Sequence, residues 1–441
     1  MKTDVIPADV IRPADRRDEA PYSSHAPIDR EAWRDILLAF AVTRLALVGV
    51  GLLAVFYIYP LLKGNPIGHV PGSDTRLPDA LWLLWLRFDG SFYVDIAKHG
   101  YWPPLSLHHA SNWVFYPLYP LVIRPFATLF GSSDTAYRLA GIAVSNAATL
   151  AALSYLYALV RREWGRAVAA RAVLYTALFP TGFYLSAIYP HALFLACAVA
   201  SLYHARRREW WHAGLWGGLA ALTRAEGLLL LVPLSWEYAR ALAVPSIAPH
   251  ADGGPSSGRV SRRPWALMRS IRGTRARGSP LALALVPVGT LLFLAYAGLQ
   301  TGDPLASPHN EAHWGRRFTL PWTTLLHSLT NPAPASGLAW NFWPLNNVLA
   351  VLGLLAVLAA FRRLPVSLAL YLLVTVVYPL CSGSMQSLGR YYLAAFPVAI
   401  LLALWSNRRP SSARTYAVVG AFAALQAALM VFFALGLPAM A

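Results

Sequence analysis

Charged side chains are scarce in this sequence. Only 13% of the 441 residues are Asp, Glu, Lys or Arg, 57% are hydrophobic, and the mean hydropathy is +0.46. Soluble globular domains carry about 25% charged residues, so this composition argues against a soluble enzyme and indicates a membrane protein. Cysteine is also rare, and Cys197 and Cys381 are too few for a disulfide scaffold.

Nucleotide-binding and hydrolytic motifs are missing as well. The sequence contains no Walker A motif, no Rossmann glycine pattern and no Ser/His/Asp arrangement, which argues against ATP-driven transport and a nucleotide-sugar-binding fold. The net charge of +17 does not indicate a nucleic-acid partner, because the arginines cluster in short links between apolar runs, such as 161–166 and 206–208. Positive residues in short loops mark the cytoplasmic side of a membrane protein.

Long apolar runs recur along the chain. A run of about 18 or more residues can cross a hydrocarbon core of ~30 Å. The polar stretch before the first run predicts a disordered cytoplasmic tail over residues 1–32, followed by a membrane domain over 33–441. We expect helices near 34–60, 137–160, 168–187, 189–205, 280–300, 341–361, 364–380, 391–406 and 414–437.

Residues 210–241 form one long apolar run that a single crossing does not explain. A single crossing would place the loop 240–279 outside, yet this loop holds eight arginines and one acid. Dividing the run into two helices at 223–227 restores a cytoplasmic loop and keeps Arg224 and Glu226 out of the bilayer centre. The sequence thus predicts an all-α polytopic protein with about eleven crossings, a cytoplasmic N-terminus and an external C-terminus.

This topology predicts three external loops, at 60–136, 301–340 and 381–390. The first is the longest and contains RFDGSFYVDIAKHGY at 87–101, which we expect to form an interfacial helix. Three prolines then make an ordinary spanning helix improbable at 112–131, so that segment is expected to be irregular.

Five motifs in order along the chain resemble a known family. They are DGxxYxxIAxxGY from 89, FYPLYPLVIR from 115, FPTGFYLSAIY from 179, GLAALTRAEG from 218 and GRYYLAAFP from 389. This arrangement resembles the PIG-V type mannosyltransferases and their bacterial relatives. The resemblance implies the GT-C fold, a multi-helix membrane glycosyltransferase that takes a sugar from a polyprenyl-phosphate donor at the external face.

The chemistry of such a transfer suggests roles for particular residues. Displacing a lipid phosphate from an anomeric carbon needs a base for the acceptor hydroxyl and an electrostatic partner for the leaving phosphate. Asp89 heads its motif and is our candidate base; alternatively, it only caps the helix that follows. Asp95 lies about 240° further around that helix and is expected to be a surface residue.

Two lone arginines are candidates for the donor phosphate. Arg224 and Arg390 stand at predicted external helix ends within apolar sequence, where a lipid phosphate would be a natural bidentate partner. Lys98 is a third candidate, although an interfacial lysine often contacts only headgroups. An ion pair with Glu226 is the alternative for Arg224.

Other polar side chains on the external loops and helix ends are candidate substrate contacts. The loop at 301–340 carries His309, Glu311 and His313 at a spacing of two, which suits a strand more than a metal site, so we predict no metal site; a divalent cation is possible but not indicated. The candidate substrate-binding residues are Tyr93, His99, Tyr116, Tyr119, His191, Glu226, His313 and Arg316.

The function expected from the resemblance is transfer of a hexose, most simply mannose, from a polyprenyl-phosphate sugar to a lipid-linked or glycan acceptor, with inversion. Membrane lipids are the other expected partners, and an alanine- and arginine-rich short chain favours a bacterial plasma membrane. Two alternatives stay open: a lipid or polysaccharide transporter, whose internal repeats we do not find, and a GT-C enzyme that uses another sugar.

Overall fold

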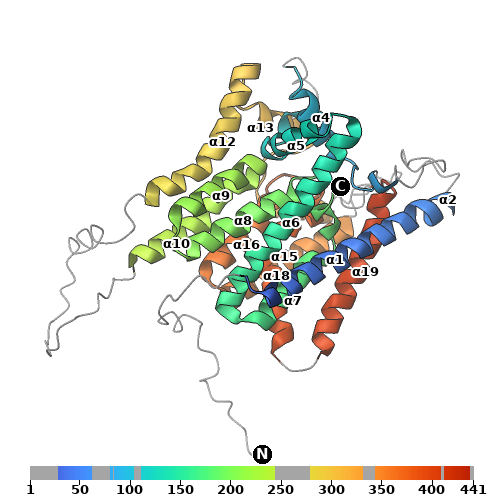
Figure 1. The fold of residues 1–441 in the computed structure, drawn as a ribbon. Helices are drawn as coiled ribbons and strands as arrows, with labels where there is room; N and C mark the ends of the chain where they lie inside the picture. The colour runs from blue at the N-terminus through green and yellow to red at the C-terminus, as the bar shows by residue number, and fades with distance from the viewer. Residues whose placement is uncertain are drawn as a thin grey trace, which may run out of the picture.

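The computed structural model describes residues 28–61, 80–82, 84–103, 111–243, 279–330, 343–408 and 412–437. These residues form helices joined by short links, and they include no strand. Most of the predicted tail 1–32 and of the basic loop 240–279 lies outside the described residues. The longer helices, arranged as in Figure 1, are α1 (Arg30–Leu53), α4 (Gly90–His99), α5 (Leu118–Leu129), α6 (Asp134–Trp164), α7 (Arg166–Ala177), α8 (His191–Arg206), α9 (Trp210–Thr223), α10 (Leu231–Ala243), α12 (Ser279–Thr301), α14 (Pro321–Thr330), α15 (Trp343–Arg363), α16 (Val366–Leu380), α18 (Phe396–Asn407) and α19 (Ala413–Ala434).

The helices confirm an all-α polytopic membrane protein. Within the described residues, five helices are long and apolar enough to cross a membrane, and the bent pair of Leu388–Ala394 with Phe396–Asn407 would make six. Helices occur at all eleven expected places. Several are short, however: α7 and α18 have 12 residues each, or about 18 Å, against a hydrocarbon core of ~30 Å. The count of eleven crossings therefore stays a prediction.

Helix α8 is the centre of the bundle. It packs against α6 and α9, and most of its side chains are buried around its whole circumference. A helix that is apolar on every side is one that the rest of the protein surrounds. Peripheral helices instead expose apolar side chains, such as Leu45 at 72% and Leu299 at 85% exposure, as expected of surfaces that face lipid.

The predicted helix at 168–187 is wrong over its second half. Helix α7 ends at Ala177, and residues 178–190 form an irregular segment with one short 3₁₀ turn at Gly182–Leu185. Pro180 disfavours helix at the residue before it, and a Cβ at position 182 would lie 2.8 Å from the Ala177 carbonyl oxygen. Hydropathy alone does not register either effect.

Buried side chains satisfy the backbone of this irregular segment. Arg44 of α1 donates to the carbonyl oxygens of Ala177 and Gly182, each at 2.9 Å, and Gln426 of α19 donates to those of Ala177 and Phe179 at 2.9 Å. Thr149 of α6 donates to the Leu185 carbonyl at 2.6 Å. Unpaired carbonyls would cost several kcal/mol each in hydrocarbon, so these side chains make the break possible.

The expected break of 210–241 is confirmed. Helix α9 ends at Thr223, a 3₁₀ turn covers Ala225–Leu230, and α10 begins at Leu231. Arg224 has an extended backbone conformation, with φ −157° and ψ 150°. The turn packs so closely on α9 that a Cβ at position 227 would lie 2.4 Å from the Ala220 backbone, so glycine is required there.

The segment 112–131 is more helical than expected. It contains α5, in which Pro120 stands in the first turn. The N–H that proline lacks would have no hydrogen-bond partner within the helix at that position. Only Pro125 removes an internal hydrogen bond. Figure 1 shows α4, α5 and α13 (Ala306–Glu311) gathered at one end of the bundle.

Helices α9 and α12 are in backbone contact through glycines. A Cβ at Gly214 would lie 1.8 Å from the Ala282 carbonyl oxygen, and one at Gly218 would lie 2.6 Å from that of Leu285. Gly214 and Gly218 form a GxxxG pattern, which permits close helix packing where lipid removes the usual hydrophobic driving force.

We expect Gly214→Val to separate α9 from α12 and to destabilise the protein by at least ~1–3 kcal/mol, the usual cost of overpacking. The measurement is thermal unfolding of the detergent-solubilised protein. Gly420→Val is the matched control, because a Cβ at Gly420 would meet nothing within 4 Å. Equal unfolding temperatures for the two variants would contradict the close packing.

Candidate active site

Asp89 and Arg390 form an ion pair at the start of α4. Nη1 of Arg390 donates to Oδ2 of Asp89 at 2.5 Å, and the two side chains are 11% and 22% exposed. Asp89 occupies the N-cap position of α4, but its side chain makes no capping hydrogen bond. The capping alternative is therefore wrong in this structure, because the carboxylate turns instead to a segment 301 residues further along the chain.

Strained backbone flanks both members of this pair. Phe88 has φ +49° and Ser387 has φ +67°, two of the four non-glycine residues with positive φ among those described. Such conformations cost of order 1–3 kcal/mol and cluster at functional sites. Arg390 is held from the other side by Thr181, whose hydroxyl donates to the Gly389 carbonyl at 2.8 Å.

Arg224 belongs to the same network. Its Nε donates to Glu226 at 2.6 Å, which confirms the ion pair given above as the alternative for Arg224. Its Nη1 lies 2.8 Å from Nε2 of His191. Arginine can only donate, so His191 accepts through Nε2 and carries its proton on Nδ1. His191 begins α8 and stacks on Tyr184 with a centroid distance of 5.3 Å.

Aromatic rings connect the arginines to one another. The Arg224 guanidinium carbon lies 4.9 Å from the centroid of Tyr391, and that of Arg316 lies 5.3 Å from the same ring. Arg316 also donates to the Tyr391 hydroxyl. The Arg390 guanidinium carbon lies 5.9 Å from the Tyr189 centroid. Three cations and two tyrosines thus converge beside Asp89.

Two buried polar atoms in this network have no hydrogen-bond partner among the described residues. They are Nε of Arg390 and Nδ1 of His191, both donors in the protonation states given above. Unmatched buried donors are rare and costly, and a ligand that accepts hydrogen bonds would satisfy them. Nearby, Glu311 approaches Arg316 with a closest N–O distance of 4.0 Å, and burial raises the pKa of its carboxyl group.

The three candidate tyrosines each contact other aromatic or polar groups of the protein. Tyr93 lies against Tyr189 with a centroid distance of 6.2 Å, and Tyr119 is fully buried with its hydroxyl bonded to Gly141 and Ser145. Tyr116 packs on Phe293 at 4.9 Å. Tyr119 also meets Tyr93 edge-on, with ring centroids 5.6 Å apart, and the substrate contacts expected of the three tyrosines stay predictions.

Four other side chains from the sequence analysis lie apart from the network. Lys98 pairs with Asp134, and His99 lies 2.9 Å from Asp95. Asp95, whose side chain is 34% exposed, also accepts from the Trp102 indole at 2.7 Å. His313 is exposed. The structure brings neither Lys98, His99 nor His313 to Asp89, and their ligand roles stay predictions.

The histidines and the acid of the 301–340 loop do not converge. His309 lies 2.8 Å from Asp303, whereas Glu311 faces Arg316. Tyr189 and Tyr391, by contrast, are in the network although neither was a candidate. Both stand inside the motifs from 179 and 389. Tyr391 directly follows Arg390 in the sequence, which was the available signal, whereas Tyr189 has only its place in the motif.

A helical membrane bundle with a buried cluster of arginines and carboxylates at one end is the class of protein that these features define. Comparison with known proteins finds similarity over part of the chain. Residues 109–245 match the family model described as dolichyl-phosphate-mannose-protein mannosyltransferase. The chain is also 29% identical to the GPI alpha-1,6-mannosyltransferase 2 of Rattus norvegicus over 171 residues, which is 36% of this chain and 32% of the relative.

A second curated relative is similar to the same degree. The GPI mannosyltransferase 2 of Schizosaccharomyces pombe is 29% identical over 160 residues, or 35% of this chain and 32% of the relative. The matches thus span about a third of these relatives. Among solved structures, the oligosaccharyltransferase AglB of Archaeoglobus fulgidus, in complex with an inhibitory peptide and a dolichol-phosphate, is similar with a TM-score of 0.41 and 14% identity, over 93% of this chain and 56% of that one.

The family matches agree with the motifs quoted above. Over about a third of its length, the chain is similar to membrane mannosyltransferases.

We expect Asp89 and Arg390 to be energetically coupled. Asp89→Asn and Arg390→Gln each leave one charge without its partner, so each should lower the unfolding temperature, and the double variant should lose less than the sum. Contacting residues show interaction energies of about 0.5–3 kcal/mol. Thermal unfolding in detergent measures the effect.

The control is the exposed pair of Lys98 and Asp134, the latter 68% exposed. Exposed ion pairs contribute about 0–1 kcal/mol, so Lys98→Gln and Asp134→Asn should be nearly additive. Additivity in both pairs would mean that the Asp89–Arg390 contact carries no coupling.

Proposed function

We propose that this protein transfers a hexose, taken to be mannose, from a polyprenyl-phosphate sugar to a lipid-linked or glycan acceptor. The observation that carries the proposal is the ion pair of Asp89 with Arg390, set beside Arg224 and His191. A carboxylate and two arginines from distant parts of the chain are the groups that glycosyl transfer from a lipid phosphate requires.

Asp89 is the proposed general base. Its Oδ2 accepts from Arg390, whereas its Oδ1 has no hydrogen bond among the described residues. Oδ1 would take the proton of the acceptor hydroxyl as that oxygen bonds to the anomeric carbon. The bond from this carbon to the phosphate oxygen breaks with its electron pair on the phosphate. A single in-line displacement of this kind inverts the anomeric configuration.

Arg390, Arg224 and His191 are the proposed partners of the leaving phosphate. A phosphate monoester gains negative charge as it departs, and guanidinium groups stabilise such charge through charge-assisted hydrogen bonds. The unmatched Nε of Arg390 and Nδ1 of His191 supply further donors without any existing bond being broken. Donor binding would draw Arg390 toward the phosphate and so release Asp89 for the acceptor.

The proposed setting is the external face of a plasma membrane, with the N-terminus cytoplasmic. This orientation rests on the arginine-rich links and the basic loop at 240–279. In it, α4, α5 and α13 cover the external end of the bundle, the tail 1–32 is cytoplasmic, and residues 60–136 and 301–340 form the external loops. A lipid-linked donor would then reach the cluster from the surrounding bilayer.

We expect Asp89→Asn to lower kcat for transfer from a short-chain polyprenyl-phosphate mannose by at least ~100-fold, since general base catalysis is worth ~10²–10⁴ in rate. Asp95→Asn, on the same helix but outside the network, is the control and should retain most activity. If Asp95→Asn were less active than Asp89→Asn, Asp89 would not be the general base.

A second comparison separates the base from the ion pair. If Asp89 only holds Arg390 in place, Asp89→Asn should do no further harm in an Arg390→Gln background. If Asp89 is the base, the double variant should lose a further ~100-fold in kcat.

We expect Arg224→Gln to raise the donor KM about 10–100-fold while the acceptor KM stays unchanged. The reason is that a hydrogen bond to a charged group contributes ~1.5–3 kcal/mol. Arg138→Gln is the control, because Arg138 has only a 4.0 Å contact to the exposed Asp134. A change confined to the acceptor KM would assign Arg224 to the acceptor instead.

A further inference from the structure

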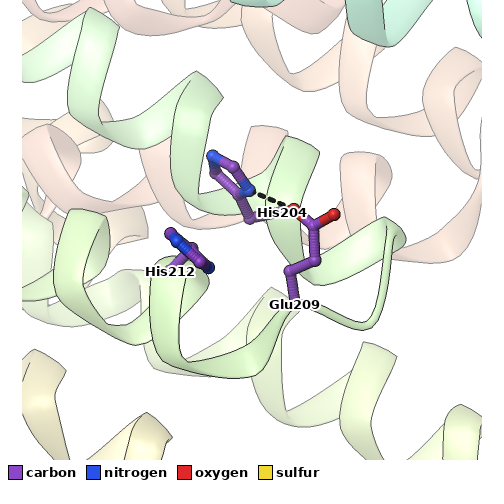
Figure 2. A group of neighbouring side chains, drawn as sticks. All are labelled: His204, Glu209 and His212. Carbon is purple, nitrogen blue, oxygen red and sulfur yellow. Dashed lines mark hydrogen bonds and ion pairs between the residues drawn. The ribbon is translucent and has the colours of Figure 1, made fainter. Parts of the chain in front are cut away.

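The turn between α8 and α9 brings two histidines and a glutamate together. His204 lies near the end of α8, Glu209 precedes α9, and His212 stands in the first turn of α9 (Figure 2). Nδ1 of His204 lies 2.5 Å from Oε2 of Glu209. The imidazoles of His204 and His212 are stacked, with centroids 5.1 Å apart and an interplanar angle of 23°.

Backbone geometry fixes this arrangement. The Glu209 N–H bonds to the His204 carbonyl and the Arg208 N–H to that of Ala205, each at 2.9 Å, which is the pattern of a Schellman motif. Arg208 takes the left-handed position with φ +61°, where glycine is usual. This motif places the side chains of its first and last residues side by side. Here those residues are His204 and Glu209, and His212 follows one helical turn later.

The donor atoms have the grouping that a metal ion requires. One ligand atom from each of the three residues lies within 4.8 Å of the others. The nitrogen of His204 that faces the carboxylate of Glu209 is Nδ1. Two imidazoles and one carboxylate are a ligand set found for Zn²⁺, with the fourth position left to water.

We propose that His204, Glu209 and His212 bind a divalent transition-metal ion, with Zn²⁺ the best match to the ligand set. Imidazole and carboxylate together favour Zn²⁺ over Mg²⁺ or Ca²⁺, which prefer oxygen ligands alone. The sequence analysis did not point to this site, because its two histidines are eight residues apart across a turn.

The proposed ion serves the scaffold rather than the transfer reaction. His191 starts α8 and His204 follows 13 residues later, which separates them by about 20 Å along the helix. Both helices joined by the turn support the candidate active site, since α8 begins with His191 and α9 leads into Arg224. A metal ion at the turn would clamp α8 to α9 at the end away from Asp89.

The test uses the full-length protein purified in detergent without a histidine tag and stripped with a chelator. Titration with ZnCl₂ should show one tight site by calorimetry and should raise the unfolding temperature, because a ligand that binds only the folded state stabilises it. Co²⁺ should give the visible absorption bands of a tetrahedral site. No tight binding of either ion would overturn the proposal.

Variants identify the ligands, which is necessary because the chain has 12 histidines. His212→Gln and Glu209→Gln should each weaken Zn²⁺ binding by at least ~10-fold, a loss that even an outer-sphere change can cause. His309→Gln is the matched control, since His309 also pairs with a carboxylate, and it should bind as the wild type does. Unchanged binding in His212→Gln would place the ion elsewhere and overturn the proposal.

Discussion

The irregular segment at 178–190 is the constraint on which the site depends. It breaks an otherwise helical bundle inside the apolar core, where every backbone carbonyl needs a donor. Arg44, Gln426 and Thr149 supply those donors from α1, α19 and α6. The break then lets the chain turn so that Tyr189 lies beside Arg390 and His191 begins α8. A continuous helix over 168–205 would leave neither residue where the network needs it.

The same reasoning explains the other breaks around the network. Arg224 stands at the end of α9, and Arg390 stands in the short helix before the 70° bend into α18. Asp89 precedes α4 rather than lying within it. Helix ends offer polar side chains without the cost of burying a charge in the middle of a span. The residues of the charged network therefore lie at the ends of helices. Strained backbone occurs at two of these places, at Phe88 and Ser387.

The ion pair of Asp89 with Arg390 gives the proposed mechanism an internal order. In the free protein the base and the phosphate ligand neutralise one another, which reduces the cost of keeping either charge partly buried. In this proposal, a donor phosphate would compete for Arg390 and would free the carboxylate only when the leaving group is in place.

The sequence by itself determined the class of protein, the places of the helices and most members of the network. Hydropathy and arginine-rich links predict the helices, and the break at 223–227 follows from the cost of Arg224 and Glu226 in a spanning helix. The motifs point to Asp89, Arg224 and Arg390. These are local properties, because hydropathy, loop charge and motif composition act over short stretches of chain.

Only the tertiary structure decided which charges meet. Asp89 could cap its helix or pair with a distant cation, and the local sequence does not distinguish the two; the position of Arg390, 301 residues away, selects pairing. Lys98 and His99 are as polar as the network residues, yet the face of α4 on which they lie gives them Asp134 and Asp95 instead. The end of α7 at Ala177 likewise depends on donors from α1 and α19. Contacts between distant segments leave no periodic trace in the sequence, so the packing of the helices has to settle them.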